Sequence, residues 1–171
     1  MTNDQFWALV ASSKAASGGT FDGYLQTLVC RLSELHPEEI FDFQRIFEEY
    51  MDRAYSWDLW GAAYVIGGGC SDDAFTDFRS WLISMGREIY EQALVNADSL
   101  AEVALGPGAE EDAFFEEFAY VPSRAYEQKT GQEMTYRRRS RPSEATGQRW
   151  AEHGPELSHR FPRLWAKYGK A

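Results

Sequence analysis

The chain has only two cysteines among its 171 residues, Cys30 and Cys70. Two cysteines do not make the disulfide framework that small secreted domains use. No apolar run approaches the roughly 20 residues that span a membrane, because glycines interrupt the longest one, residues 59–70. The first residues, MTNDQFWALV, lack the basic start and the long apolar core of a secretory signal. The sequence therefore predicts a cytoplasmic protein without membrane contact.

Motifs for metals and cofactors are also missing. No cluster of His and Cys has the spacing of a zinc site. Residues 67–73, GGGCSDD, lack the lysine of a phosphate-binding loop. Asp72, Asp73 and Asp77 carry oxygens that suit a divalent cation, although helix capping and pairing with an arginine account for the same residues. We expect no metal and no cofactor.

The charges are unevenly distributed along the chain. The 27 acidic residues and 17 Lys and Arg give a net charge of −10, which opposes general binding to nucleic acid. Residues 129–171 nevertheless carry ten Lys or Arg and only four Asp or Glu. Arg137, Arg138, Arg139 and Arg141 either form an anion or nucleic-acid patch or pack on the acidic part of the same chain. The second interpretation is favoured, because covalent linkage keeps the acidic part close.

Apolar residues recur at helical spacing, and no alternation persists long enough to indicate a strand. The composition, 44% hydrophobic and 15% aromatic, is typical of a globular protein with an aromatic core. Asn3 or Asp4 is predicted to cap a first helix and Thr20 a second, and a third begins at Pro37. Residues 59–66 form the next helix, Ser71 or Asp72 caps another, and one more follows Gly86. Further helices are predicted over residues 110–129, 144–153 and around 157–168. Pro122 is expected to kink or split the helix over residues 110–129.

This pattern predicts an all-α fold, a single-domain bundle of roughly six to eight helices. Residues 1–133 are expected to form its helical body. Residues 134–171 are expected to form an irregular, basic C-terminal extension that packs on the same core.

A glycine joint, from Gly67 to Asp73, separates the two predicted helices in the middle of the chain. Its three consecutive glycines suit the end of a helix, where a residue often needs a positive φ. Ser71 and Asp72 are good N-cap residues for the next helix, and the negative charge of Asp73 is favourable in a first turn. The joint therefore gathers polar groups between two apolar helices.

Two functional hypotheses centre on the glycine joint. In the first, a binding or regulatory module recognises a small polar ligand or a protein partner in a cleft with aromatic walls and a few polar groups. The residues expected to line it are Trp60, Tyr64, Asp72, Asp73, Arg79 and Trp81. In the second, an enzyme uses Cys70 as a nucleophile, or Asp72 and Asp73 as acid–base groups, with Arg79 or Arg87 stabilising negative charge.

Structural explanations stand beside both hypotheses. Cys70 precedes a helix, which favours the thiolate, but the neighbouring acids oppose it, and a small buried cysteine also suits a close helix crossing. Asp72, Asp73 and Arg79 can form a buried capping and salt-bridge network that only secures the reversal of the chain.

The central stretch also resembles a known family. GGCSDDAFTDFRSWLISMGR, preceded by LWGAAYVIG, is similar to the central motif of a bacterial family called domain of unknown function 4240. Phe6 and Trp7 match an aromatic pair near the family's start, and residues 98–101, DSLA, resemble a later motif, although the family often has proline where this chain has Ala97. Residues 115–131, which include Ala125 and Tyr126, resemble the part after that, so the resemblance covers residues 1–133. It implies no particular activity, because none is assigned to the family.

Overall fold

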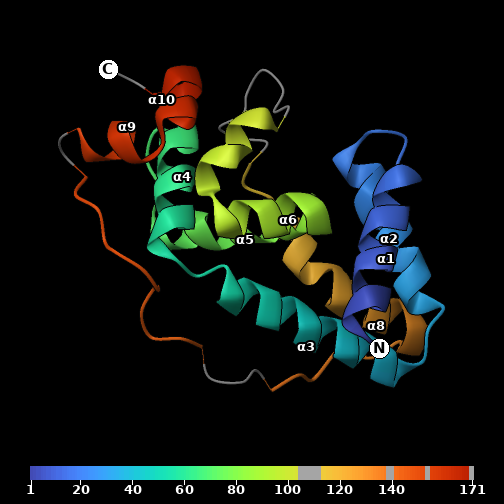
Figure 1. The fold of residues 1–171 in the computed structure, drawn as a ribbon. Coiled ribbons are helices and arrows are strands. Elements are labelled where there is room, and N and C mark those ends of the chain that lie inside the picture. The colour runs from blue at the N-terminus through green and yellow to red at the C-terminus, as the bar shows by residue number, and fades with distance from the viewer. Residues whose placement is uncertain (104–112, 138–140, 153–154, 170–171) are drawn as a thin grey trace. The chain divides into compact units, whose positions relative to one another are not determined.

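The computed structural model describes residues 1–103, 113–137, 141–152 and 155–169. Within these residues the protein is all-α: α-helices and short 3₁₀-helices follow one another, and no β-strand forms (Figure 1). Eight of the described α-helices have seven residues or more. The predicted fold class is therefore confirmed.

The chain folds into two compact units, and each is assembled from two separate stretches. Unit 1 consists of Met1–Tyr50 and Glu116–Arg141, and unit 2 consists of Met51–Phe115 and Pro142–Ala171. The chain therefore passes from one unit to the other three times. The division into residues 1–133 and 134–171 stays a prediction.

Unit 1 contains α1 (Asn3–Ala15), α2 (Phe21–Ser33), most of α3 (Pro37–Arg53), the 3₁₀-helix η2 (Glu116–Tyr120) and α8 (Val121–Thr130). Its core is aromatic. The ring of Phe6 lies 4.6 Å from that of Phe43, and the indole N–H of Trp7 donates to the hydroxyl of Tyr50 at 2.8 Å. The helical stripes of the sequence thus bury aromatic side chains together.

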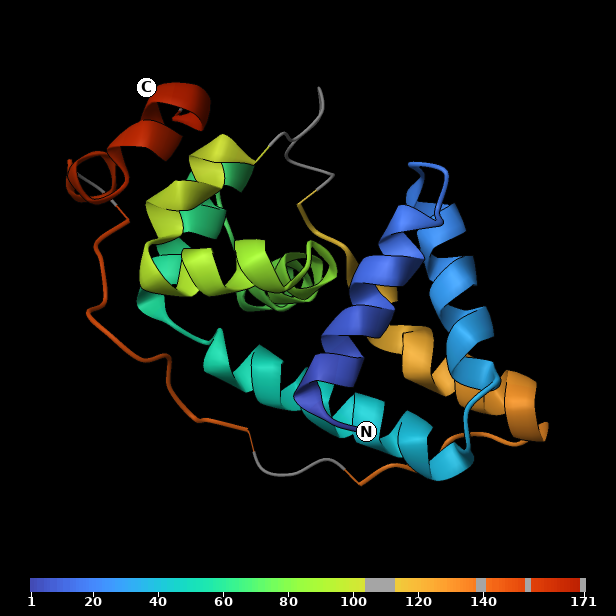
Figure 2. The ribbon, with the colours of Figure 1, turned by 45° about the vertical axis from the view of Figure 1, so that its right-hand side comes forward.

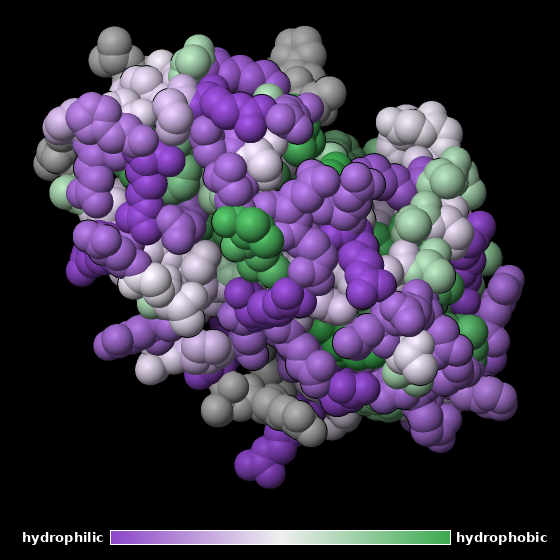
Figure 3. Space-filling view, in the orientation of Figure 1, coloured by the Kyte–Doolittle hydropathy of each residue, from purple (hydrophilic) through white to green (hydrophobic). Residues whose placement is uncertain are grey.

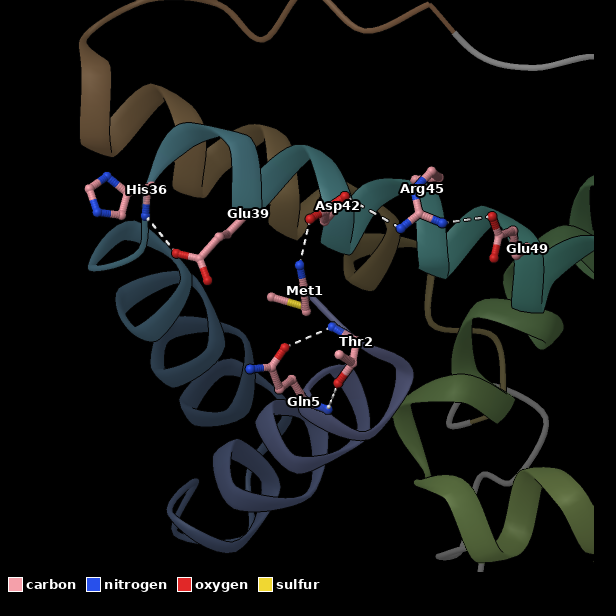
Figure 4. Close-up of polar contacts among 8 residues, drawn as sticks. All are labelled: Met1, Thr2, Gln5, His36, Glu39, Asp42, Arg45 and Glu49. Carbon is pink, nitrogen blue, oxygen red and sulfur yellow. Dashed lines mark hydrogen bonds and ion pairs between the residues drawn. The ribbon is translucent and has the colours of Figure 1, made fainter.

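Local hydrogen bonds set where the first helices begin (Figure 4). The hydroxyl of Thr2 accepts the backbone N–H of Gln5, and the side chain of Gln5 accepts the backbone N–H of Thr2. This reciprocal pair satisfies two N–H groups at the start of α1. The predicted cap at Asn3 or Asp4 was therefore one or two residues too late, whereas Thr20 caps α2 as predicted.

Unit 2 contains α4 (Trp57–Gly67), α5 (Asp72–Ser84), α6 (Arg87–Val95), the 3₁₀-helix η1 (Ala97–Glu102), α9 (Glu156–Arg160) and α10 (Pro162–Tyr168). Helix α10 packs against α4 and η1, and Figures 1 and 2 both show it beside α4. On α5, Phe75, Phe78 and Leu82 are fully buried. Helices from residues 57–102 and from residues 156–168 thus share one core.

Two predicted helices differ from the structure. The helix over residues 110–129 begins later than predicted: residues 110–112 lie outside the described part, and residues 113–115 are not helical. From Glu116 the segment is helical, and it is split into η2 and α8 next to Pro122, as expected. Pro122 sits in the first turn of α8, where its missing N–H costs no hydrogen bond. The helix over residues 144–153 is wrong for its described residues, 144–152. There the backbone of Thr146 bonds to Tyr55 and Trp57 instead of to its own neighbours.

On the face that Figure 3 shows, most of the surface is hydrophilic, and hydrophobic residues reach it in small areas. In the part of the chain that the structure describes, no helix is long and apolar enough to cross a membrane. Both observations agree with a sequence whose apolar residues are mostly buried in the cores of the two units.

Candidate functional site

The glycine joint reverses the chain between α4 and α5. Gly68 adopts the left-handed conformation, with φ of 65°, and its N–H donates to the carbonyl of Tyr64. Gly69 also has a positive φ, 146°, which side chains rarely tolerate. The hydroxyl of Ser71 then accepts the N–H of Ala74 at 3.2 Å and caps α5. The glycines are therefore required by backbone geometry, and Ser71 is the cap among the two predicted residues.

Trp60 holds the chain that leaves the glycines. Its indole N–H donates to the carbonyl of Cys70 at 3.0 Å. The same indole is stacked between the rings of Trp57, at 5.0 Å, and Phe75, at 4.9 Å. A half-buried tryptophan of α4 thus fixes the last residues before α5.

Arg79 connects α5 to the end of α3. Its side chain is 8% exposed, and one Nη donates to the carbonyl of Met51 at 2.9 Å. Met51 lies in the last turn of α3, where carbonyls lack partners within the helix and a cation is favourable. The guanidinium also lies 4.8 Å from the ring centre of Tyr55 and 4.9 Å from that of Phe75. Arg79 is therefore part of the framework beneath the joint.

Asp72 and Asp73 lie in the first turn of α5 and are exposed. Among the described residues neither carboxylate forms an ion pair, so the buried network with Arg79 that the sequence suggested does not form in that way. The reason is geometric: Arg79 donates to the carbonyls of Met51 and Phe75 and to the hydroxyl of Thr76 instead. The two carboxylates are left in contact with solvent.

The other residues singled out from the sequence differ in burial: some lie at the surface and some in the core. Tyr64 is half-buried and meets the ring of Trp150 edge to face at 4.9 Å. Trp81 is only 1% exposed and packs on Phe78, so it lies in the core. Arg87 is exposed in the first turn of α6. The joint therefore brings Trp60, Tyr64 and the two aspartates to the surface, with Arg79 and Trp81 beneath.

Cys70 is half-buried at the joint. Burial, then the charges of Asp72 and Asp77, raise the pKa of its thiol to about 12, although Arg79 acts in the opposite direction. At neutral pH the thiol is therefore protonated, whereas a nucleophilic cysteine works as the thiolate. The joint does not activate Cys70.

The described residues contain no group of three or more His, Cys, Asp or Glu side chains that is close enough to hold a metal ion.

Unit 1 has an open hollow of about 770 Å³ between α1 and α2. It is lined by Leu9, Gln26, Thr27, Cys30, Arg31, Glu34 and Leu35. Sequence reasoning missed this hollow, and its one local signal was that Cys30 lies off the apolar stripe of α2.

Comparison with known proteins identifies the family. The model of a family described as Protein of unknown function (DUF4240) matches residues 1–128. No curated protein and no solved structure matches the chain. The matched range includes α4, the glycine joint and α5, whereas α9 and α10 lie beyond it. Three quarters of the chain are thus covered by that model, and the chain belongs to the DUF4240 family of proteins of unknown function.

Proposed function

We propose that the protein is a binding module whose recognition surface is the glycine joint. In this proposal Asp72 and Asp73 bind a positively charged group, an ammonium or a guanidinium, of a small polar ligand or of a partner segment. The observation that carries the proposal is that both carboxylates are adjacent, exposed and not ion-paired among the described residues. Such carboxylates are acceptors with no partner of their own to displace.

The framework of the joint supports the proposal, because binding is tighter when the binding groups are held in place beforehand. The Trp60 indole fixes the carbonyl of Cys70, and the Ser71 hydroxyl fixes the first turn of α5. Trp60 and Tyr64 are half-buried beside the joint, so the exposed carboxylates lie next to an aromatic framework.

The enzymatic alternative requires that the thiol of Cys70 be reactive as a thiolate. A nucleophilic cysteine has a lowered pKa, whereas burial and two aspartates raise the pKa of Cys70 to about 12. We expect the folded protein to alkylate at the exposed Cys30 at least about 100-fold faster than at Cys70 at pH 8. Mass spectrometry of iodoacetamide-treated protein measures both rates. Faster labelling of Cys70 would revive the enzyme hypothesis.

The test of the binding proposal is a thermal unfolding screen with cationic probes: spermidine, arginine, choline and a tetralysine peptide. A compound that binds only the native state raises the unfolding midpoint by mass action. We expect one of these probes to stabilise the wild type and not the double variant Asp72→Asn/Asp73→Asn. Asp22→Asn is the matched control, because Asp22 is also an exposed acid in a first turn, that of α2. An equal shift in the double variant, or no shift with any probe, would refute the proposal.

A further inference from the structure

The C-terminal part of unit 2 covers one face of α4 and η1. We call residues 146–168, as far as the structure describes them, the C-terminal clasp. It begins where Thr146 forms an isolated bridge with Ser56 and ends with α10 packed on α4 and η1. The clasp lies entirely outside the range that the family model matches, whereas α4 and η1 lie inside it.

The centre of the contact is a close fit between ring and backbone. A Cβ atom at Gly61 of α4 would lie 2.5 Å from Cε2 of Phe161, so only glycine leaves room for this ring. The indole N–H of Trp150 donates to the carbonyl of Trp57 at 2.9 Å, and the same ring meets Tyr64. The clasp therefore covers aromatic residues of α4 beside the glycine joint.

The polar contacts of the clasp join a basic segment to an acidic surface. Arg160 pairs with Asp58 at 2.6 Å, and Arg163 pairs with Glu102. Asp98 of η1 is 6% exposed and accepts the backbone N–H groups of Arg163, at 3.1 Å, and of the next residue, at 2.9 Å. It thereby caps the start of α10 from another element. The packing interpretation of Arg137, Arg138, Arg139 and Arg141 stays a prediction, because residues 138–140 lie outside the described part.

The clasp has little structure of its own. Its helices have five and seven residues, too short to be stable alone in water. Four of its apolar side chains are buried: Trp150, Leu157, Phe161 and Leu164. The clasp therefore has few buried side chains for the number of residues that it orders. Segments with few buried apolar contacts tend to open before the rest of a protein unfolds.

We propose that the clasp is a separate cooperative element that opens while α4 and α5 stay folded. Three observations carry this proposal: the close fit of Phe161 at Gly61, the cap that Asp98 of η1 provides for α10, and the shortness of the clasp's own helices. Opening uncovers Trp57, Gly61 and Tyr64, an aromatic face beside the glycine joint. The clasp is thus a built-in cover of that face. This opening does not depend on whether the joint binds a cation, so the two proposals succeed or fail separately.

Native-state hydrogen exchange of the full-length protein, followed by NMR, tests the opening. The reporters are the amides of Phe161 and Trp165, which are hydrogen-bonded inside the clasp, and the amides of α5 as reference. We expect the clasp amides to be protected at least about tenfold less than those of α5. Equal protection, with equal dependence on denaturant, would show that the clasp opens only on global unfolding and would overturn the proposal.

A pair of variants identifies what holds the clasp. The double variant Arg160→Gln/Arg163→Gln removes the ion pairs of Arg160 with Asp58 and Glu156 and that of Arg163 with Glu102. It should accelerate exchange in the clasp about fivefold, with α5 unchanged. Arg53→Gln is the matched control, because it removes the exposed Arg53–Glu91 pair in the same unit but away from the clasp. It should leave the ratio of clasp to α5 exchange unchanged. If the control and the double variant act alike, the ion pairs act on unit 2 as a whole and the clasp is not separate.

Discussion

The glycine joint and the contact between η1 and α10 both place carboxylates at the start of a helix, but at different depths. Asp72 and Asp73 belong to the helix that they begin, and both are exposed. Asp98 belongs to another element, is 6% exposed and accepts two backbone N–H groups of α10. Water replaces a lost partner at the surface but not in the interior, so only the buried carboxylate is expected to matter for stability. The exposed pair is the one left for binding.

The largest expected effect is that of Asp98→Ala. It leaves two backbone N–H groups of α10 without their acceptor in a buried place, which we expect to lower the free energy of unfolding by about 3 kcal/mol. Urea denaturation followed by tryptophan fluorescence measures this. Asp73→Ala is the comparison, with an expected loss below about 0.5 kcal/mol. Similar losses in the two variants would contradict the contrast between a buried and an exposed carboxylate.

Arg79→Met tests the framework beneath the joint. It keeps an apolar stem but leaves the carbonyl of Met51 without the guanidinium, and we expect a loss of about 2 kcal/mol in the free energy of unfolding. Arg53→Met, at the exposed end of the same helix α3, should cost below about 1 kcal/mol, because an exposed ion pair contributes little. If both changes cost the same, Arg79 is not a framework residue.

Gly61→Ala tests the fit of the clasp. The added Cβ meets the ring of Phe161, and relieving that contact should cost about 1–2 kcal/mol in the free energy of unfolding. The double variant Gly61→Ala/Phe161→Leu provides the control. Its cost should be smaller than the sum of the two single costs, because the smaller side chain makes room for the Cβ. Strictly additive costs would mean that ring and glycine do not contact one another.

The smallest expected effect is that of Asp72→Asn/Asp73→Asn on stability. Both changes remove charge from the first turn of α5, where an exposed acid contributes only tenths of a kcal/mol, about 0.5 in total. The loss should vanish at 0.5 M salt, which screens exposed charges. Calorimetric unfolding at low and high salt measures it. A loss above about 2 kcal/mol would make the pair structural and would undercut the proposed binding role.

Sequence predictions were accurate where the interactions join residues close together in the chain, and they failed where the partners lie far apart in it. The starts of α2 and α3 were predicted at Thr20 and Pro37, and that of α5 at Ser71 or Asp72. These positions depend on hydrogen bonds within a few residues or on a backbone preference. The helix predicted around Trp150 was wrong, because the backbone of Thr146 bonds to Tyr55 and Trp57, about ninety positions away, instead of to its own neighbours. One partner of Arg79, the carbonyl of Met51, is 28 residues distant, so no local spacing indicates it.

The sequence by itself determined most of the helices, their apolar stripes, the glycine joint and membership in the family, because each depends on neighbouring residues or on a contiguous motif. Tertiary structure alone decided which acids are buried and which are exposed. Asp72, Asp73 and Asp98 are the same residue type, and all lie near helix starts. What separates them is whether a distant segment packs over the carboxylate and removes its water, as α10 does over Asp98. That choice rests on packing between segments some 65 residues apart, which no local pattern encodes.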